Sequence, residues 1–387
     1  MKAENIITEK PKAKIGIIGC GARVRGLFPL CEDYSIEGIF DPSPEAIAAA
    51  REVYGAHVRN YESVDSLVND PEITWVVVGS WNVQHAEQVI AALRGGKHVF
   101  CEKPLATNLK DCLAVRDAVE ASGCMFFFGL VLRFSPFYQK IHELLQGGEI
   151  GRLISFEFNE TLNFYHGAYI MGNWRRFREN AGTHLLEKCC HDMDIAQWLT
   201  GSLPRRVASF GGLNFFTPEM GATRRNKEKT ERPHPVWQGG EQADPFTSEK
   251  DIVDNQVVIL EYANGVRASF HTNCATGIPE RRIYLIGSEG AIRADALTGK
   301  IELRRMGADA PTQHFDTNVD GGHPGGHAGG DAVLEASFRR SMLHGEPPLV
   351  GVDAALRAAV VSFAIDEALD TGTIVDLEAV WKSAGIQ

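Results

Sequence analysis

The sequence predicts an α/β protein with two domains: an N-terminal domain built on a doubly wound parallel sheet and a C-terminal α+β domain. Three observations support this prediction. Short apolar runs alternate with helix-like segments between residues 14 and 129, which is typical of parallel βαβ units. A glycine cluster at residues 16–21 overlaps the end of the first apolar run. Beyond residue 129, turn sequences such as Asn264-Gly265 join neighbouring apolar runs, which indicates hairpins and an antiparallel sheet.

The length and composition are those of an ordinary globular protein. The chain has 387 residues, enough for two domains and a substantial core, and 44% of them are hydrophobic. The formal net charge is −11 and no basic run stands out, which argues against nucleic acid or an anionic membrane as the main partner. The first apolar stretch, Ile15–Ile18, is far too short for a secretion signal or a membrane span.

The eight cysteines are scattered along the chain, and none belongs to a C-x-x-C pair. This spacing argues against a zinc knuckle or a redox motif. It is typical of buried free thiols in a reducing compartment. We therefore expect a cytoplasmic protein without a bound metal.

We place the first domain at residues 12–132. Five apolar runs are predicted to form its strands: Ile15–Ile18, Ile36–Phe40, Ile73–Val78, His98–Cys101 and Met125–Phe128. Helices are predicted between them, over Pro44–Tyr54, His85–Arg94 and Leu109–Ser122.

We place the second domain at residues 133–387. Helices are predicted over Phe137–Gln146 and Gly182–Leu199, with a strand at Leu153–Leu162. Two hairpins follow, formed by Gln256–Tyr262 with Val266–His271 and by Ile283–Ile286 with Ala291–Ala294. Residues 217–251 are polar, contain Pro and Gly and lack periodicity, so we expect a long loop insertion there.

The glycine cluster predicts a site for a dinucleotide. In Gly16-Ile17-Ile18-Gly19-Cys20-Gly21, glycines at the end of a strand allow a tight turn and the close approach of a pyrophosphate. Asp41 ends the second strand, twenty residues after Gly21, where a carboxylate can bind the adenosine ribose and repel a 2′-phosphate. Val24 replaces the third glycine of the G-x-G-x-x-G pattern, so the motif is incomplete. The context still predicts a Rossmann domain that binds NAD in preference to NADP.

Two further segments carry groups suited to catalysis. Cys101-Glu102-Lys103-Pro104 directly follows the fourth strand, and a doubly wound sheet binds its ligands at the carboxyl ends of its strands. In the predicted helix, Glu187 and His191 are four residues apart and Lys188 and His191 three apart, so one face can carry all three. Either segment alone is more often solvated surface than active site.

Together, these residues resemble the Gfo/Idh/MocA oxidoreductase family, which contains glucose-fructose oxidoreductase and inositol dehydrogenases. The similarity covers nearly the whole chain and includes the glycine loop, the Glu-Lys-Pro motif at 102–104, Trp174-Arg175 and the helix ending in His191-Asp192-Met193-Asp194. The sequence Glu-Lys-Cys-Cys-His-Asp at 187–192 is similar to a subgroup described as predicted dehydrogenases. The resemblance implies a second domain with a large, mainly antiparallel open sheet, a homodimer or homotetramer, and a sugar, cyclitol or related polyol as substrate.

The resemblance also implies roles for individual residues. Lys103 matches the lysine of the Glu-Lys-Pro motif and His191 the histidine of the family's helix. Glu187 stands where many members carry aspartate, whereas Lys188 departs from the family pattern. We expect these four residues to be catalytic. The expected cofactor-binding residues are Gly19, Gly21, Ala22, Arg23, Asp41, Ser80, Asn82, His85, Glu102 and Lys103.

The expected reaction is hydride transfer between NAD and a secondary alcohol, which requires a group that takes the hydroxyl proton. A histidine suits this role near pH 7, and a lysine can polarise the same oxygen. The sequence leaves open whether His191 or Lys103 accepts the proton. Two other functions remain open: redox-neutral processing of a glycoside through a keto intermediate (hydrolysis, elimination or epimerisation), and a non-catalytic NAD-binding regulator. The presence of both residues argues against the regulator.

Further candidates concern the substrate pocket. We expect Arg133, Trp174 and Arg175 to line it, because an aromatic face and a fork of donors suit a polyol; a structural tryptophan and a surface arginine are equally compatible with the pattern. His323 and His327 lie in a glycine-rich stretch, for which we favour a flexible active-site loop over a metal site. The remaining interpretation is a plain helix entry capped by Asp331.

Overall fold

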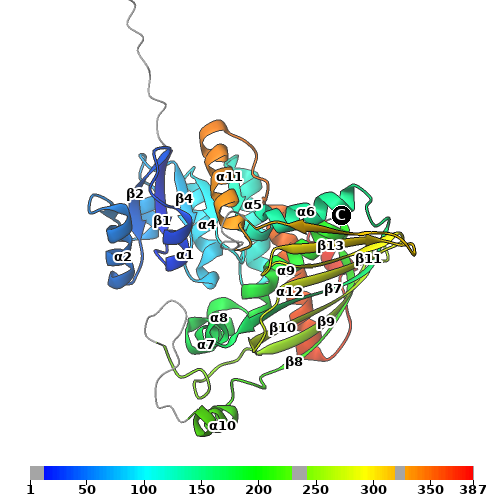
Figure 1. Cartoon of the computed structure of the whole chain (residues 1–387). Coiled ribbons are helices and arrows are strands. Elements are labelled where there is room, and N and C mark those ends of the chain that lie inside the picture. The colour runs from blue at the N-terminus through cyan, green and yellow to red at the C-terminus, as the bar shows by residue number, and fades with distance from the viewer. Residues whose placement is uncertain (1–12, 229–241, 319–326, 387) are drawn as a thin grey trace, which may run out of the picture.

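The computed structural model describes residues 13–228, 242–318 and 327–386. Two sheets dominate it, a parallel one in the blue and cyan part of the chain and a larger one in the green and yellow part (Figure 1). The predicted α/β class is confirmed: a Rossmann-type sheet precedes a mixed sheet that is mainly antiparallel.

The first sheet has, among the described residues, six strands in the order β3-β2-β1-β4-β5-β6, and every neighbouring pair is parallel. This is the strand order of dinucleotide-binding domains. Helices cover both faces, so the central strands are buried on each side and read as continuous apolar runs. The strands are β1 (Ala13–Ile18), β2 (Tyr34–Phe40), β3 (Arg59–Asn60), β4 (Trp75–Val78), β5 (His98–Cys101) and β6 (Phe126–Phe128).

The helices between these strands begin where a polar side chain can cap them. Ser43 and Asn108 each accept a hydrogen bond from a backbone amide three residues on, which satisfies one of the amides that a helix start leaves without a partner. The predicted helices over 44–54, 85–94 and 109–122 are confirmed. The helical segments are α1 (Ala22–Leu27), α2 (Pro44–Tyr54), α3 (Val64–Val68), η1 (Asn82–Gln84), α4 (His85–Arg94) and α5 (Leu109–Ser122).

The second sheet has the order β14-β13-β12-β11-β7-β10-β9-β8-β15, and β7 with β10 is its one parallel pair among the described residues. Both predicted hairpins are present. Gly265, at φ +86°, forms the turn between β9 and β10, a backbone region open to glycine at low cost. The strands are β7 (Leu153–Asn163), β8 (Pro204–Gly212), β9 (Asn255–Tyr262), β10 (Arg267–Thr276), β11 (Arg282–Gly287), β12 (Gly290–Asp295), β13 (Lys300–Arg305), β14 (Thr312–Asp316) and β15 (Val375–Asp376).

Helix α9 (His184–Thr200) runs through the interior of the molecule and carries the predicted catalytic groups. The Thr183 hydroxyl caps its start by accepting from the amide of Leu186, and Gly201 in the left-handed region ends it. Nearly all its side chains are buried, so its ionisable residues do not lie on a solvated face. Other helical segments here are η2 (Val131–Phe134), α6 (Pro136–Gln146), α7 (Phe164–Gly172), η3 (Trp174–Arg176) and α8 (Arg178–Ala181).

The chain returns to the first sheet near its end. Phe338 of α11 (Gly330–His344) packs edge-on against Phe28, Trp75 and Phe100 of the Rossmann core. The other C-terminal helices are α12 (Val352–Thr371) and α13 (Glu378–Ser383). The predicted domain boundary at residues 132 and 133 falls inside η2 and stays a prediction.

The segment 217–251 is not wholly the irregular loop that we expected. It contains α10 (Pro218–Glu228), whose start is supported by Pro218 at its first position and by the Thr217 hydroxyl, which accepts from the amide of Met220. Phe246 packs in a small apolar cluster with Phe216. The prediction was wrong in this part because α10 is polar and shows little apolar periodicity.

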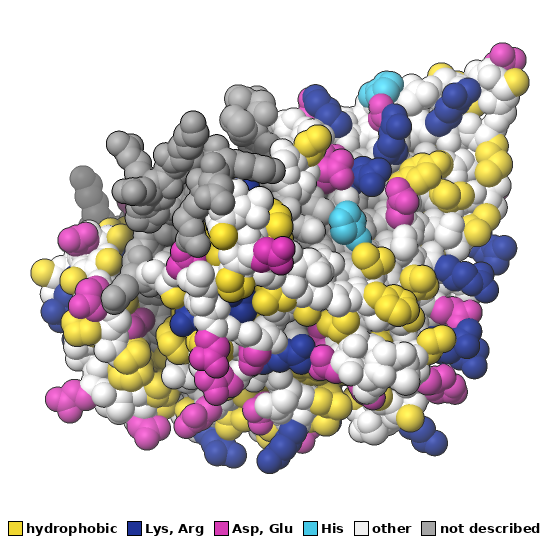
Figure 2. All heavy atoms as spheres, turned by 90° about the horizontal axis from the view of Figure 1, so that it is seen from below, with side chains coloured by type: hydrophobic (Ala, Val, Ile, Leu, Met, Phe, Trp, Pro, Cys, Tyr) yellow, Lys and Arg dark blue, Asp and Glu magenta, His cyan; other side chains and the backbone are white. Residues whose placement is uncertain are grey.

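The face shown in Figure 2 mixes basic, acidic and hydrophobic side chains instead of gathering one sign of charge. On neighbouring strands β8 and β9 of the second sheet, three large apolar side chains are exposed: Phe210 of β8 at 70%, Ile259 of β9 at 58% and Val257 of β9 at 49%. Among the described helices, none is both long and apolar enough to span a bilayer.

Candidate active site

The candidate site is a cavity between the carboxyl edge of the parallel sheet and helices α7 and α9. Together with the open solvent at its mouth, the hollow takes up about 820 Å³. Both halves of the chain contribute to its lining. The lining residues are Arg23, Gly79, Ser80, Asn82, His85, Glu102, Lys103, His166, Tyr169, Ile170, Arg175, Glu187, Lys188, His191 and His327.

The glycine loop lies at the adjoining ends of β1 and β4. Gly19 has φ +87°, and a Cβ at this position would lie 2.3 Å from the backbone nitrogen of Ser80, so only glycine fits. A Cβ on Gly21 would meet no atom within 4 Å, so the space in front of the loop is open. Ala22 follows as the first residue of α1. This arrangement fits a dinucleotide, whose pyrophosphate needs close backbone approach.

Asp41 is held rigidly at the carboxyl end of β2. Its Oδ2 accepts from the amide of Cys20 at 2.7 Å, and its Oδ1 accepts from the amide of Ser43 at 2.8 Å. The carboxylate therefore sits beside the glycine loop, where the sequence predicted a contact with the ribose.

The carboxyl edge of the parallel sheet continues after β4 with Ser80, Asn82 and His85. The His85 ring is buried and lies 2.7 Å from the carbonyl oxygen of Pro104 and 3.2 Å from that of Ser80. Burial lowers the pKa of His85, which makes it a neutral spacer between the ends of β4 and β5. The Asn82 amide donates to the carbonyl of Ala181 at 2.8 Å and so connects the two halves of the chain.

Lys103 reaches across the cavity to α9, and its peptide bond to Pro104 is cis. Its Nζ donates to the Glu187 carboxylate at 3.0 Å and to the Glu187 carbonyl at 2.5 Å. The same carboxylate accepts from Arg175 Nε at 3.0 Å, and Arg175 also donates to the Tyr169 hydroxyl at 2.9 Å. Burial alone would raise the pKa of Glu187, but the two cations outweigh it and lower that pKa well below its usual value.

His191 is buried one turn further along α9, and its Nδ1 has no hydrogen-bond partner among the described residues. Burial, followed by the neighbouring Lys103, lowers the pKa of His191 well below its usual value. The ring is therefore neutral at pH 7. His327 lies beside it, with the ring centres 5.9 Å apart.

Lys188 points into a second charged group on the same helix. Its Nζ lies 3.4 Å from the Glu160 carboxylate, which also pairs with Arg281 at 2.9 Å. Arg281 in turn makes a two-pronged pair with Asp192, at 2.6 and 3.0 Å. Burial raises the pKa of Asp192 to about 6, and the guanidinium of Arg281 opposes this rise.

Arg23 links the glycine loop to both the Glu-Lys-Pro motif and the end of the chain. Its Nε donates to Glu102 at 2.8 Å, and its Nη1 donates to Asp331 at 2.6 Å. Asp331 also lies 3.0 Å from His327 Nδ1. The helix-entry interpretation that made Asp331 an N-cap is wrong, because Gly329 occupies that position and Asp331 lies in the first turn of α11.

Several predicted substrate residues lie elsewhere. Arg133 is not part of the cavity lining: it pairs with Asp194 at 2.6 and 2.7 Å and lies over the Trp198 ring. The expectation for Arg133 failed because a buried carboxylate on α9 attracts it into the core. Trp174 stacks on Trp81 near the cavity, while its neighbour Arg175 lines it. His323 lies outside the described residues.

Four polar or charged residues at or behind the cavity were not predicted from the sequence. His166 and Tyr169 reach it from α7, and Glu160 and Arg281 lie behind Lys188. Burial, followed by Lys188, lowers the pKa of His166 to about 2. A weak signal existed for α7, since an Asn side chain caps a short aromatic helix immediately after a strand. Glu160 and Arg281 stand on β7 and just before β11, and no local pattern connects them.

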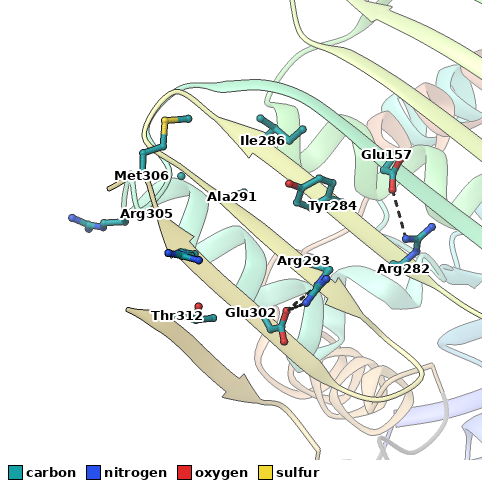
Figure 3. Close-up of a pocket in the computed structure, with 12 residues that line it drawn as sticks. Glu157, Arg282, Tyr284, Ile286, Ala291, Arg293, Glu302, Arg305, Met306 and Thr312 are labelled. Carbon is teal, nitrogen blue, oxygen red and sulfur yellow. Dashed lines mark hydrogen bonds and ion pairs between the residues drawn. The ribbon is translucent and has the colours of Figure 1, made fainter. Parts of the chain in front are cut away.

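A second hollow lies on β11, β12 and β13 of the second sheet (Figure 3). Two ion pairs lie within it: Glu157 lies 3.6 Å from Arg282, and Arg293 donates to Glu302 at 2.8 Å (Figure 3). Arg304 and Arg305 also line it, and Arg305 pairs with Glu149 outside the hollow. No histidine or lysine is among the described residues that line it. The first cavity is therefore the candidate active site. Among the described residues, no group of three or more His, Cys, Asp or Glu side chains is arranged to hold a metal.

The carboxyl edge of the Rossmann sheet carries Lys103 and faces the neutral His191 across one cavity. This arrangement is that of an NAD-binding oxidoreductase. Residues 13–130 match the model of the oxidoreductase family with an NAD-binding Rossmann fold, and residues 142–377 match that of its C-terminal alpha/beta domain. The chain therefore belongs to the Gfo/Idh/MocA oxidoreductase family, as the motifs indicated.

The chain is similar in sequence to proteins that are named for different reactions. The chain is 27% identical over 303 residues to 2,7-anhydro-N-acetylneuraminate hydratase of Escherichia coli, covering 78% of this chain and 71% of the relative. It is 24% identical over 374 residues to myo-inositol 2-dehydrogenase of Thermotoga maritima, covering 95% and 99%. A structure of levoglucosan dehydrogenase with NADH and levoglucosan has a TM-score of 0.77 at 20% identity, covering 95% of this chain and all of that one, which shows a shared fold.

Proposed function

We propose that this protein transfers hydride between NAD and a secondary alcohol of a sugar, a sugar derivative or a cyclitol. One observation carries the proposal: Lys103, from the end of a Rossmann strand, and His191, from the second half of the chain, line the same cavity. An alcohol dehydrogenation needs a proton acceptor and a polarising group at one oxygen, and the cavity offers both. The myo-inositol and levoglucosan dehydrogenases among its relatives support this class of substrate.

The proposal takes NAD rather than NADP as the cofactor. Asp41 is fixed beside the glycine loop by two backbone amides, and its negative charge would repel a 2′-phosphate. Bound NAD would accept or return the hydride. The phosphates of NAD would be held by Gly19, Gly21, Ala22 and Arg23. The rest of the cofactor would lie along the carboxyl edge of the sheet, against Ser80, Asn82, His85 and Glu102.

Residues of the chain itself transfer the proton, polarise the oxygen and bind the substrate. His191, buried and neutral, takes the hydroxyl proton during oxidation and returns it during reduction. Lys103, anchored by Glu187 at 3.0 Å, donates a hydrogen bond to the same oxygen. Lys188 and Arg175 hold the substrate next to them.

The test is to replace His191 and Lys103 separately by Ala, with His314→Ala as the control. His314 stands on β14, away from the cavity, and its side chain is 66% exposed. Loss of a general acid or base lowers kcat by about a hundredfold to ten-thousandfold. NADH affinity, measured by fluorescence titration, should stay unchanged in the His191 and His314 variants, whereas the Lys103 variant also removes an expected contact to the cofactor. Near-normal turnover in the His191 variant would refute its role.

A redox-neutral reaction is the second candidate, and the Tyr169 hydroxyl of α7 favours it. This hydroxyl lines the cavity beside Lys103 and His191, so it offers a second proton donor for elimination or epimerisation, whereas burial keeps His166 neutral. The Escherichia coli relative is named a hydratase. The two reactions differ in stoichiometry: a dehydrogenase accumulates NADH as product forms, whereas a redox-neutral enzyme forms product without net NADH.

We further propose that the chain forms a homodimer or homotetramer and works in the cytoplasm. The exposed Phe210, Val257 and Ile259 of the second sheet support the first part, because such a face is usually covered. Light scattering at two protein concentrations measures it. The location follows only from the scattered cysteines.

A further inference from the structure

His191, the proposed proton acceptor, lies where a proton from the substrate can reach it but is poorly stabilised. The residue is 2% exposed, and no hydrogen bond or ion pair joins its ring to a carboxylate among the described residues. Burial, followed by Lys103, lowers the pKa of the ring well below its usual value. A proton taken from an alcohol therefore needs a second group to which it can move.

His327 lies next to His191 in the cavity lining and has a carboxylate partner. The two ring centres are 5.9 Å apart, and the side chain of His327 is 26% exposed. Its Nδ1 lies 3.2 and 3.0 Å from the two carboxylate oxygens of Asp331. A histidine held by a carboxylate is a common arrangement of acid–base groups in enzymes.

The carboxylate determines which nitrogen of His327 can take a proton. Burial alone would raise the pKa of Asp331, but His327 and Arg23 lower it to about 2, so Asp331 is ionised at pH 7. An ionised carboxylate only accepts hydrogen bonds, so Nδ1 of the neutral ring carries the hydrogen. Nε2 then carries the lone pair and is the nitrogen that can take a proton.

The backbone holds His327 in this position in spite of strain. His327 and Ala328 have φ +50° and +53°, in the left-handed region that residues with a Cβ seldom adopt. The buried Ser135 hydroxyl donates to the Ala328 carbonyl at 2.8 Å. The Gly330 amide donates to the His327 carbonyl at 3.2 Å, and a Cβ on Gly330 would lie 2.7 Å from the carbonyl oxygen of Val131. Strained residues that are held in place cluster at functional sites, which favours a role for this ring beyond packing.

The charged groups around His327 allow its ring to gain a proton only briefly. Burial lowers its pKa, and Asp331, the carboxylate in contact with it, opposes this effect. A proton on His327 lowers the pKa of His191 in turn, so the two rings hold one proton at a time. The groups that act on the ring are Asp331 of α11, Arg23 of α1, Glu160 of β7, and Lys188 and His191 of α9.

The two other histidines among the described lining residues are less suited to receive the proton. Both ring nitrogens of His85 lie against backbone carbonyl oxygens, at 2.7 and 3.2 Å. Burial, followed by Lys188, lowers the pKa of His166 to about 2. His327 is therefore the better receiver.

We propose that His327 relays the proton of the reaction between His191 and solvent, and that Asp331 is the positioning residue that orients its ring. The inference rests on the proposed function, since it names the path of the proton that hydride transfer releases. In oxidation, the O–H bond of the alcohol breaks, its proton bonds to His191 and the hydride goes to NAD. The proton then moves to Nε2 of His327, through at most one water, and leaves for solvent. One alcohol and one NAD thus give one ketone, one NADH and one proton.

The first experiment separates the first turnover from the later ones by stopped-flow absorbance of NADH, with myo-inositol and glucose as alcohol probes. His327→Ala leaves His191 and Lys103 intact, so the first NADH per protein should form at nearly the unaltered rate. Later turnovers should slow by at least about tenfold, a smaller loss than that of a base in contact with the substrate. Imidazole added to the buffer should restore them, because it can take the proton in place of the missing ring.

The second experiment tests the orientation of His327 without a substrate, by nitrogen NMR of histidine-labelled protein with NADH bound. The signals of His327 are those absent from the Ala variant, and they should show a neutral ring with its hydrogen on Nδ1 at pH 7. Asp331→Asn should admit the other tautomer, because a side-chain amide can donate to Nδ1 as well as accept from it. The same variant should slow the later turnovers and not the first.

The control is His344→Ala, which removes an exposed histidine from the end of the same helix, α11, and should leave both phases unchanged. Later turnovers that keep the unaltered rate in His327→Ala overturn the inference, as does a failure of imidazole to restore slowed ones. A first turnover that is lost together with the later ones also overturns it, because His327 would then act on the substrate itself. A His327 ring with its hydrogen on Nε2 overturns the role of Asp331.

Failure of the proposed function gives a different result. If the unaltered protein oxidises no secondary alcohol, hydride transfer is refuted and the relay with it, while a hydrogen on Nδ1 of His327 upholds the pair with Asp331. If the probes are oxidised and His327→Ala turns over at the unaltered rate, the proposed function stands and the relay is refuted.

Discussion

The nucleotide end and the substrate end of the cleft are formed by different parts of the polypeptide. At the nucleotide end, backbone conformation shapes the site: Gly19 takes a positive φ, and Asp41 accepts from two backbone amides. At the substrate end, side chains shape it: Lys103, Glu187 and Arg175 form one charged group and Lys188 begins another. The first end thus depends on steric fit and the second on charge balance.

This difference separates the expected effects of mutation. The nucleotide end, whose shape is set by the backbone, tolerates the substitution of nearby polar side chains but not an added Cβ on its glycine. A charged, buried end tolerates changes of shape better than the loss of one partner, since the remaining charge is left without compensation. Substitutions at the two ends should therefore change different measured quantities.

The largest effect is expected from Gly19→Ala at the nucleotide end. The added Cβ would lie 2.3 Å from the Ser80 amide nitrogen, and neither backbone segment can move away cheaply. With the strain of a positive φ, we expect NADH affinity to fall by about a hundredfold or more. Fluorescence titration measures it, with thermal unfolding to verify the fold.

Gly26→Ala is the matched control for that change. Gly26 lies in the following helix, α1, and a Cβ there meets no atom within 4 Å. Its NADH affinity should match that of the unaltered protein. Comparable losses in both variants would show that the loop's conformation is not what holds the nucleotide.

The next effect, at the substrate end, is expected from Glu187→Gln. Removing this carboxylate leaves Lys103 and Arg175 without their shared anion. Breaking a buried ion pair typically costs about 3 kcal/mol of unfolding free energy, and kcat/KM should also fall by at least about tenfold. Urea unfolding and steady-state kinetics measure the two quantities, while NADH affinity should remain intact.

Glu143→Gln serves as its control, because Glu143 pairs with Lys140 on the exposed side of α6 and its side chain is 69% exposed. It should change the unfolding free energy by less than about 0.5 kcal/mol. A large loss of NADH affinity in the Glu187 variant would contradict the separation of the two ends.

The same contrast explains what could be predicted from the sequence. The nucleotide end is local: the glycine loop, Asp41 and the helices after them lie within one βαβ unit, where apolar periodicity and spacing are informative. The substrate end is assembled from distant positions. Lys103 and Glu187 were found through motifs, whereas Glu160 and Arg281 meet Lys188 only because β7 and β11 pair beneath α9.

The errors have similar causes. Arg133 was expected in the pocket because it follows a strand end, yet Asp194 on α9 holds it in the interior. The helix α10 was missed because its polar composition hides its periodicity. The position of Arg133 depends on a tertiary partner far away in the sequence, and the polar helix gives no apolar pattern to detect.

The smallest effect is expected where the two ends meet, at the pair between Arg23 and Asp331. Burial alone would raise the pKa of Asp331, but His327 and Arg23 outweigh it and lower it to about 2. A carboxylate with a lowered pKa stabilises the fold above its unfolded pKa, about 3.9, and loses this contribution as the pH falls towards 2. Asp331→Asn should cost about 1 kcal/mol at pH 7, because both side chains are partly exposed.

The measurement is the difference in unfolding free energy between the unaltered protein and the Asp331→Asn variant from pH 8 to pH 3. It should stay constant down to about pH 4.5 and then shrink, because protonation of Asp331 removes the charge that the variant lacks at every pH. Asp309→Asn, at an exposed loop position, should show no such difference. A change that begins well above pH 4.5 would instead assign the effect to His327, which lies 3.0 Å from the same carboxylate and whose pKa is lowered by burial. That outcome would place a titrating charge at the junction and weaken the contrast between a nucleotide end shaped by backbone and a substrate end shaped by charge.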